Sequence, residues 1–206
     1  MPKVVDPEAR RELVADAVLA QIVDAGLDSV TLARVAERSG LAIGSVRHYF
    51  SDFGELMDFT FGLVLRRNAQ RAERAALRDP STIDELVERI VFLLPITAEQ
   101  HVENVAYIEF LAHSRSYPAV RSTLEQARAA AEEGLRQWLR VALPRVDDAE
   151  LDARTRMLSA VVDGLAFDAA IGARPLDASQ VRAAVERCLR VSDPPATQPA
   201  ASTATD

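Results

Sequence analysis

The sequence is poor in cysteine and in long apolar stretches. Cys188 is its only cysteine, so no disulfide can form within the chain and a reducing compartment is the natural setting. The longest uncharged apolar run, residues 90–98, falls well short of the about 20 residues that a membrane-spanning helix needs. Residues 1–3 lead into an acidic stretch and not into a hydrophobic signal region. We therefore expect a cytoplasmic protein with no membrane partner.

The motifs of the common enzyme classes are also missing. The sequence has no phosphate-binding loop, no GxGxxG motif and no HExxH motif. His101 and His113 lie on one expected helix, about 120° apart around its axis, so they cannot share a metal ion from that helix alone. Cys188 has no histidine near it on its helix and is better explained as a small packing residue than as a nucleophile. We expect no enzyme, no metal site and no cofactor.

Acidic residues outnumber basic ones, with 31 Asp and Glu against 24 Lys and Arg and a net charge of −7. Within residues 31–50, however, Arg34, Arg38 and Arg47 are opposed by Glu37 alone. A positive segment on an acidic body can hold DNA locally while the body discourages unspecific binding. Solvated arginines on helix surfaces would explain the same charge pattern equally well.

Every long periodic segment has the helical period and none alternates like a strand, so the predicted fold class is all-α. Gly26 is expected to end the first helix in a Schellman-type stop, and Gly40 to end the second. Capping residues followed three positions later by an acid or amide mark helix starts at Thr82, Thr97, Asp147 and Asp177. The expected helices cover residues 7–25, 31–39, 43–50, 54–79, 83–94, 98–114, 118–141, 148–173 and 178–191.

Residues 31–50, TLARVAERSGLAIGSVRHYF, have the pattern of a helix-turn-helix. This motif needs a small residue where its helices cross, a glycine in the turn and apolar anchors under the second helix. Ala36, Gly40, Leu41, Val46 and Phe50 would fill these roles. The second helix would then present its outer face to the major groove, where a guanidinium can contact guanine and an aliphatic group a thymine methyl. The outward residues would be Ile43, Ser45, Arg47, His48 and Tyr49. A helical hairpin of this kind can also be purely structural.

From Val14 to Leu56 the chain resembles the N-terminal domain of TetR-type repressors in spacing as well as residue type. The family's glycine-ended first helix, Thr-capped second helix with an Ala-Glu-x-x-Gly turn, and closing Tyr/His-Phe pair correspond to Gly26, Thr31, residues 36–40 and residues 49–50. This chain departs from the family in Arg47, usually tyrosine, and in Phe53, usually lysine. The DNA-binding residues that the resemblance implies are Thr31, Arg34, Ala42, Ile43, Gly44, Ser45, Arg47, His48 and Tyr49.

The C-terminal half resembles the betaine-type subgroup of these regulators, in Leu94-Pro95, in residues 112–114 followed by Pro118, and in residues 162–165. The resemblance implies that the last two helices pair with their copies in a four-helix bundle, where Gly164 would allow close approach. The alternative is that these helix faces pack inside the monomer. The expected dimer interface is Met157, Val161, Gly164, Ile171, Val181, Val185 and Cys188.

The resemblance also implies a ligand cavity enclosed by the fourth to eighth helices. For most of the candidate aromatic residues an ordinary place in the core is the simpler explanation. Glu109 lies in the apolar run of residues 105–112 and, if buried, needs a partner, either an internal arginine or a cation on a ligand. The candidate lining residues are Phe59, Leu63, Phe92, Asn104, Tyr107, Ile108, Leu111, Trp138, Asp163 and Phe167.

We therefore expect an N-terminal helix-turn-helix domain over residues 1–53, a helical ligand-binding and dimerisation domain over residues 54–192 and a disordered tail over residues 193–206. The expected partners are a second copy of the chain, a palindromic double-stranded DNA operator and a small-molecule effector of unknown identity. One alternative is a helix-turn-helix regulator without a small-molecule ligand. Another is a helical small-molecule carrier or enzyme that has kept the DNA-binding domain without using it.

Overall fold

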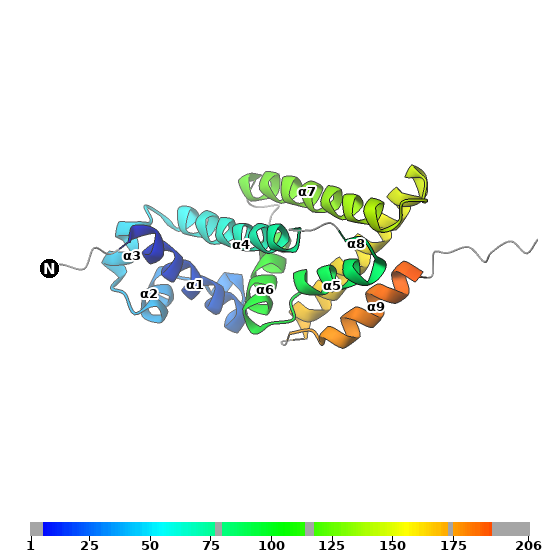
Figure 1. Ribbon diagram of the computed structural model, residues 1–206. Coiled ribbons are helices and arrows are strands. Elements are labelled where there is room, and N and C mark those ends of the chain that lie inside the picture. Colours follow the sequence, from blue (N-terminus) through cyan, green and yellow to red (C-terminus); the bar gives the residue numbers. More distant parts are fainter. Residues whose placement is uncertain (1–5, 77–79, 114–117, 173–174, 191–206) are drawn as a thin grey trace, which may run out of the picture.

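A computed structural model describes residues 6–76, 80–113, 118–172 and 175–190. In these residues the chain is built from helices and has no strand, which confirms the predicted all-α class (Figure 1). A short 3-10 helix, Leu27–Ser29, follows the first helix. The α-helices are α1 (Pro7–Ala25), α2 (Leu32–Ser39), α3 (Ile43–Tyr49), α4 (Phe53–Ala75), α5 (Ile83–Leu93), α6 (Ala98–His113), α7 (Pro118–Ala142), α8 (Asp148–Ile171) and α9 (Ala178–Arg190). None of the described helices is both long enough and apolar enough to span a bilayer.

The helix starts lie where the capping residues predict them. Thr82 and Asp147 each accept a hydrogen bond from the backbone N–H three positions later, which pairs one of the N–H groups that a helix start leaves without an internal partner. At Thr97 the bonds are reciprocal: its hydroxyl accepts from Gln100 N at 3.2 Å, and Gln100 Oε1 accepts from Thr97 N at 3.0 Å. A complete capping box therefore opens α6.

Two helix ends differ from the prediction. Gly26 has φ 78° but ψ 165°, and its N–H bonds Ile22 O, so the stop after α1 is not a Schellman motif. That motif occurs instead after α2, where Gly40 is left-handed and Leu41 N donates to Ala36 O. Helix α4 ends at Ala75, four residues before the predicted end. The predicted ends at residues 79, 114, 173 and 191 and the predicted tail lie outside the described residues.

The helices form two groups joined by α4, which leads from the small N-terminal unit of α1–α3 to the helices of the C-terminal part (Figure 1). Helix α1 packs against α2, α4 and α6, so the N-terminal unit rests on two helices of the remainder. Helix α8 packs against α6, α7 and α9, and α9 also packs against α5. Helix α7 lies along one side of the molecule and contacts α8 far more than α4 or α5.

Buried apolar residues form two clusters. The first joins α1–α3 to α4, α6 and α7, with Val18, Phe50, Phe61 and Phe110 among its members. The second joins α5, α7, α8 and α9, with Leu86, Leu151 and Leu158 in its centre. Because the first cluster continues through α4 into α6, the N-terminal unit of α1–α3 is packed onto the helical body and not merely tethered to it. The domain boundary expected after residue 53 remains a prediction.

One buried carboxylate joins three helices. Glu103 on α6 is only 1% exposed, and it forms ion pairs with Arg71 at 2.5 Å and Arg67 at 3.4 Å, both on α4. Arg67 also pairs with Asp16 on α1 at 2.9 Å. The internal acid–arginine pair considered for Glu109 is therefore made by Glu103, whereas Glu109 is half-exposed beside His113.

We predict that Glu103→Gln lowers the free energy of unfolding by about 3 kcal/mol, near the low end of the cost of breaking a buried ion pair, because Arg67 and Arg71 retain some contact with water. Urea denaturation followed by circular dichroism measures the change. The control is Glu109→Gln on the same helix, whose effect should stay within about 0.5 kcal/mol. Equal effects of the two substitutions would contradict a structural role for the Glu103 ion pairs.

Candidate nucleic-acid interface and ligand cavity

The anchors predicted for the helix-turn-helix are in place. Ala36, Val46 and Phe50 are buried and Leu41 is half-buried against them. Gly40, with φ 68° and ψ 21°, makes the tight turn between α2 and α3 in a left-handed backbone conformation that residues with a Cβ rarely adopt. These contacts hold α3 by its inner face and leave most of its outer face uncovered by the residues that the structure describes.

The end of α3 is held to the start of α4 by stacked side chains. The Arg11 guanidinium lies 4.6 Å from the ring centroids of both Phe50 and Phe59, and it pairs with Glu55 at 2.9 Å. Glu55 Oε2 also accepts from the Ser51 N–H at 2.7 Å. The pKa of Glu55 lies below its usual value because hydrogen bonds from Ser51, and then from Arg11, stabilise the carboxylate. The recognition helix therefore moves with α1 and α4 and not independently of them.

The outer face of α3 is accessible over most of its predicted length. Ala42, Ile43, Gly44, Arg47 and His48 are exposed. Ser45 and Tyr49 are half-buried, and Tyr49 packs on the first core cluster with its ring edge-on to His48, at a centroid distance of 5.4 Å. Tyr49 can therefore offer a contact only with its hydroxyl end.

The arginines near α3 are not equivalent. Arg38 is held by Asp24 at 2.5 Å, which neutralises it within the chain. Arg34 donates to Ser29 O at 3.2 Å, and its backbone N–H donates to the Thr31 hydroxyl at 3.3 Å. Within the described part of the chain, Arg47 makes no hydrogen bond or ion pair. The positive segment expected from Arg34, Arg38 and Arg47 is therefore carried mainly by Arg47 and Arg34.

A cavity of about 790 Å³ lies between α4, α5, α7 and α8. Of the ten predicted lining residues, only Trp138 and Asp163 line it. The largest group of missed residues lies on α7, which contributes several small side chains to the lining. The run of alanines with Gly134 is the feature of the sequence that could have indicated it. The lining residues are Ala72, Ile90, Leu93, Arg128, Ala130, Ala131, Glu132, Gly134, Leu135, Trp138, Arg156, Ser159, Ala160, Val162 and Asp163.

The other predicted lining residues have different places. Phe59 and Tyr107 pack against the first core cluster, and Leu63 is buried. Asn104 donates to Ala166 O at 2.7 Å and so joins α6 to α8. The remaining four do not line the cavity either: Ile108 is half-buried, and Leu111, Phe167 and Phe92 are exposed.

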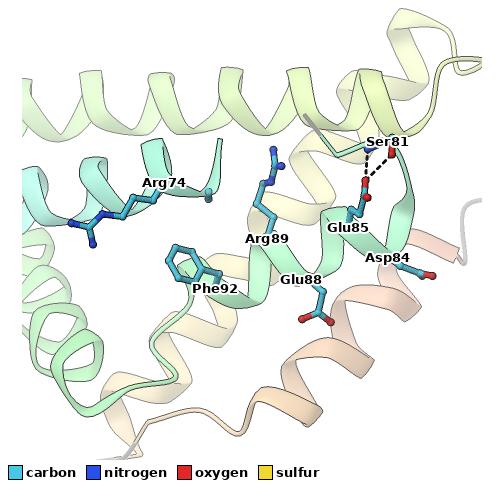
Figure 2. A pocket seen from close by; sticks show the side chains of 8 residues that line it. Arg74, Ser81, Asp84, Glu85, Glu88, Arg89 and Phe92 are labelled. Atoms are coloured by element: carbon cyan, nitrogen blue, oxygen red, sulfur yellow. Dashed lines mark hydrogen bonds between the residues drawn. The ribbon is translucent and has the colours of Figure 1, made fainter. Parts of the chain in front are cut away.

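Phe92 lines a second, more open cleft of about 670 Å³, between the end of α4 and α5 (Figure 2). Its acidic side chains already have partners. Glu85 accepts from the Ser81 N–H and hydroxyl at 2.7 Å, and Glu88 pairs with Arg182 of α9 at 2.5 Å. These contacts explain why the pKa values of Glu85 and Glu88 lie below their usual values. The acidic groups of this cleft hold the ends of helices together.

Ion pairs and stacked cations surround the larger cavity. Arg128 pairs with Asp163 at 3.0 Å, and both side chains are more than half-exposed. The Arg89 guanidinium lies over the Trp138 ring at 4.9 Å from its centroid. Burial, and then the negative charge of Asp163, raise the pKa of Tyr107. Among the described residues there is no group of three or more His, Cys, Asp or Glu that could hold a metal ion.

The expected dimer face is divided between surface and core. On α8, Met157 and Ile171 of the predicted set are 40% and 68% exposed, and nothing among the described residues lies within 4 Å of the place where a Cβ would stand on Gly164. Phe167, a residue predicted to line the cavity, is 50% exposed on the same helix. Val161 of the same helix is half-buried. On α9 the expectation is wrong.

The α9 residues of the predicted interface face the inside of the chain. Val181 and Val185 are 1% and 0% exposed because α9 turns this side onto α5 and α8, within the second core cluster. Cys188 is half-buried beside the same cluster, and its burial raises the pKa of the thiol. A packing role explains the three residues, and α8 alone retains an exposed apolar stripe from the predicted set.

Comparison with known proteins gives this architecture a family. An exposed recognition helix in a helix-turn-helix, packed on a helical body with its own cavity, defines the class of helix-turn-helix transcriptional regulators. The model of the family described as "BetI-type transcriptional repressor, C-terminal" matches residues 82–191. The chain is 32% identical over 182 residues to the regulator BetI of Paraburkholderia xenovorans (strain LB400), covering 86% of this chain and 90% of that protein. The chain belongs to the BetI-type branch of the TetR family, whose members are transcriptional regulators and not enzymes.

The chain is also similar to a second regulator in sequence and to solved structures in fold. The regulator PksA of Bacillus subtilis (strain 168) is 28% identical over 176 residues, which cover 82% of each chain. A transcriptional regulator from Rhodococcus sp. RHA1 has the same fold with a TM-score of 0.74 at 23% identity, covering 88% of this chain and 94% of that one. A regulator from Saccharomonospora viridis, solved in complex with choline, has a TM-score of 0.74 at 18% identity over 91% and 98% of the two chains.

Proposed function

We propose that this regulator is a ligand-responsive repressor that binds a palindromic operator as a homodimer. The observation that carries the proposal is the outer face of α3, which is exposed at Ile43, Gly44, Arg47 and His48, while Val46 and Phe50 anchor the helix from beneath. A helix presented in this way fits the major groove, and two copies related by a two-fold axis would read two half-sites about one helical turn apart.

The proposed DNA contacts are of two kinds: contacts to phosphates, which position the protein on the duplex, and contacts to bases, which read the sequence. The start of α2, with Thr31 and Arg34, would hold phosphates, as would the Tyr49 hydroxyl. Because Arg47 has no partner among the described residues, its guanidinium is available to fork onto a guanine. The residues that would face the groove are Ala42, Ile43, Gly44, Ser45, Arg47 and His48.

The proposed dimer interface is centred on α8. Met157, Phe167 and Ile171 form an exposed apolar stripe, and Gly164 in its middle leaves room for a second helix. Large exposed apolar patches usually mark an interaction surface. A second copy of α8 fits this face because a two-fold interface places the same patch on both sides.

The effector would occupy the cavity of about 790 Å³, a size within the usual range of small-molecule sites. Ala72 of α4 lines the cavity, and the preceding residue, Arg71, pairs with Glu103. Movement of α4 on ligand binding would therefore reach Arg67 and, through Asp16, the DNA-binding unit. Such coupling between two sites is typically worth about 1–3 kcal/mol.

The rival functions differ in what they require of the cavity and of α3. A regulator without a ligand would be expected to have a filled core, which the cavity between α7 and α8 argues against. A carrier would have no operator. Choline, as in the Saccharomonospora viridis structure, would need a carboxylate or an aromatic face free to receive a cation. Glu132, Asp163 and Trp138 are the lining groups of that kind among the described residues. Asp163 and Trp138 each already contact an arginine, and the proposal names no effector.

Selection of bound fragments from random or genomic DNA tests the repressor function. We expect enrichment of a palindrome whose half-site centres lie about one helical turn, or a multiple of it, apart. With about six to ten phosphate contacts per dimer, affinity for that site should fall by about 10³–10⁵ between about 50 and 200 mM salt. If no palindrome is enriched, with or without cell extract to supply an effector, the carrier function gains the support that the repressor loses.

Arg47→Ala should weaken binding to the selected operator by about 1–3 kcal/mol and relax the preference at one base pair, because a bidentate contact to guanine is lost. Titrations of fluorescent duplexes with each base at that position measure both effects. Arg38→Ala is the matched control: its guanidinium is already paired with Asp24, so any loss should be small and independent of sequence. Equal weakening by Arg47→Ala on every duplex would show a phosphate contact instead.

Gly164→Arg should convert the dimer to a monomer, as measured by light scattering coupled to size exclusion. Nothing in the chain lies within 4 Å of the added Cβ, and arginine favours a helix more than glycine does, so the variant should fold. The control is Gln70→Arg, at an exposed position of α4, and this variant should remain dimeric. A dimeric Gly164→Arg protein would place the interface elsewhere.

A further inference from the structure

The cavity of about 790 Å³ is closed toward α5 and open between α7 and α8. Ile90 and Leu93 of α5 and Leu135 of α7 are buried or half-buried in its lining. The exposed lining residues all lie on α7 and α8, among them Ala131 of α7 and Ala160 of α8. A small-molecule site usually encloses about 70–90% of the ligand surface. A ligand bound to one chain alone would therefore remain in contact with water along this opening.

Ala160 belongs to two surfaces at once, because it lines the cavity and also lies in the exposed stripe of α8. Residues three or four positions apart are neighbours on a helix. Met157, Ala160, Gly164, Phe167 and Ile171 follow this spacing without interruption, and all five are exposed. The stripe proposed as the dimer face thus meets the opening of the cavity at Ala160. A second chain packed along the stripe lies beside that opening.

The sizes of the stripe residues favour one arrangement of the two α8 helices. In an antiparallel two-fold pair that crosses at Gly164, the residues before the glycine face those after it, so Ala160 lies opposite the partner's Phe167. In a parallel pair each residue would lie beside its own copy, which crowds the two Phe167 rings and leaves a gap between the two alanines. Because large side chains pack well against small ones, the antiparallel pair fits better.

We propose that the partner subunit completes the effector site, with the partner's Phe167 lying over Ala160 at the opening between α7 and α8; this rests on the proposed ligand-responsive homodimer. Phe167 is 50% exposed and does not line the cavity of its own chain. In the dimer its ring covers the part of a ligand that a single chain leaves in water. Ligand binding and dimerisation are then coupled, because each favours the state in which the site is closed.

Binding of a neutral dye to the dimer and to a monomer tests the proposal. Trp138 lines the cavity and is the only tryptophan in the chain, so energy transfer from it reports a dye bound there. N-phenyl-1-naphthylamine, which fluoresces in apolar surroundings, should bind the dimer. Gly164→Arg, once light scattering shows it to be monomeric, should bind the dye at least about tenfold more weakly, although Gly164 does not line the cavity. Equal affinity in the monomer, or no binding to the dimer, would overturn the proposal.

Mixed dimers show whether Phe167 acts across the interface. Gly134→Leu fills the cavity of its own chain, where an added Cβ meets no described atom within 4 Å, and it keeps Phe167. Phe167→Ala keeps its cavity and cannot cover the cavity of its partner. Both homodimers should bind the dye at least about tenfold more weakly than the unmodified dimer.

A heterodimer of these two variants, isolated through two affinity tags, should recover one dye site of near-normal affinity, because the Gly134→Leu chain covers the intact cavity of the other. Phe53→Ala is the control: this phenylalanine is 37% exposed at the other end of α4 from Ala72, and its loss should leave dye binding unchanged. A heterodimer that binds no better than the Phe167→Ala homodimer would refute a site shared between subunits.

Failure of this proposal and failure of the proposed function give different results. If Gly164→Arg is monomeric and still binds the dye as the unmodified protein does, the α8 dimer stands and the shared site fails. If the heterodimer recovers the dye site but no fraction of cell extract releases the selected operator, the shared site stands and the ligand-responsive function fails. A Gly164→Arg protein that remains dimeric removes the basis of both.

Discussion

The buried carboxylate of Glu103 constrains the whole arrangement of α1, α4 and α6. A carboxylate that is almost fully enclosed has lost its water, and it is tolerated only where positive charge replaces that water. Arg67 and Arg71, one helical turn apart on α4, supply that charge. Helix α4 must therefore keep one register against α6. Arg67 extends the same requirement to α1 through Asp16.

Through α4, this constraint links α3, the helix proposed to enter the major groove, to the cavity. The beginning of α4 is held to the end of α3 by Arg11, stacked between Phe50 and Phe59. Its middle is held to α6 by Glu103, and its later part lines the cavity at Ala72. A single helix thus touches the DNA-binding unit, the buried ion pairs and the cavity. In the proposed ligand-responsive function, movement at one end of α4 would reach the other end through these packed contacts and ion pairs.

Local and long-range features differed in how far the sequence predicted them. Helix starts at Thr82, Thr97 and Asp147 lie where predicted, because a cap depends on residues three positions apart. Which face of a C-terminal helix is buried inside the chain depends on the helix that packs against it, and that neighbour is distant in sequence. Val181 and Val185 share an apolar face that suits a partner copy or the core equally well, and the packing of α9 on α5 decides for the core. The acid of the buried ion pair was missed for the same reason: Glu109 has more apolar neighbours in sequence, but Glu103 faces α4.

Helix α8 has one side on the cavity and another side on the surface of the chain. Helix α8 has Ser159 and Asp163 on the cavity side, whereas Met157, Gly164 and Ile171 are exposed on its surface. In the proposed dimer that surface meets its copy. A ligand that separated Asp163 from Arg128 would release α8 from α7 at the point where the two helices are joined by an ion pair. In the proposed dimer, the resulting shift of α8 would act on the α3 helices of both copies, through the dimer interface as well as along α4, because a two-fold interface places the same surface of α8 on both copies.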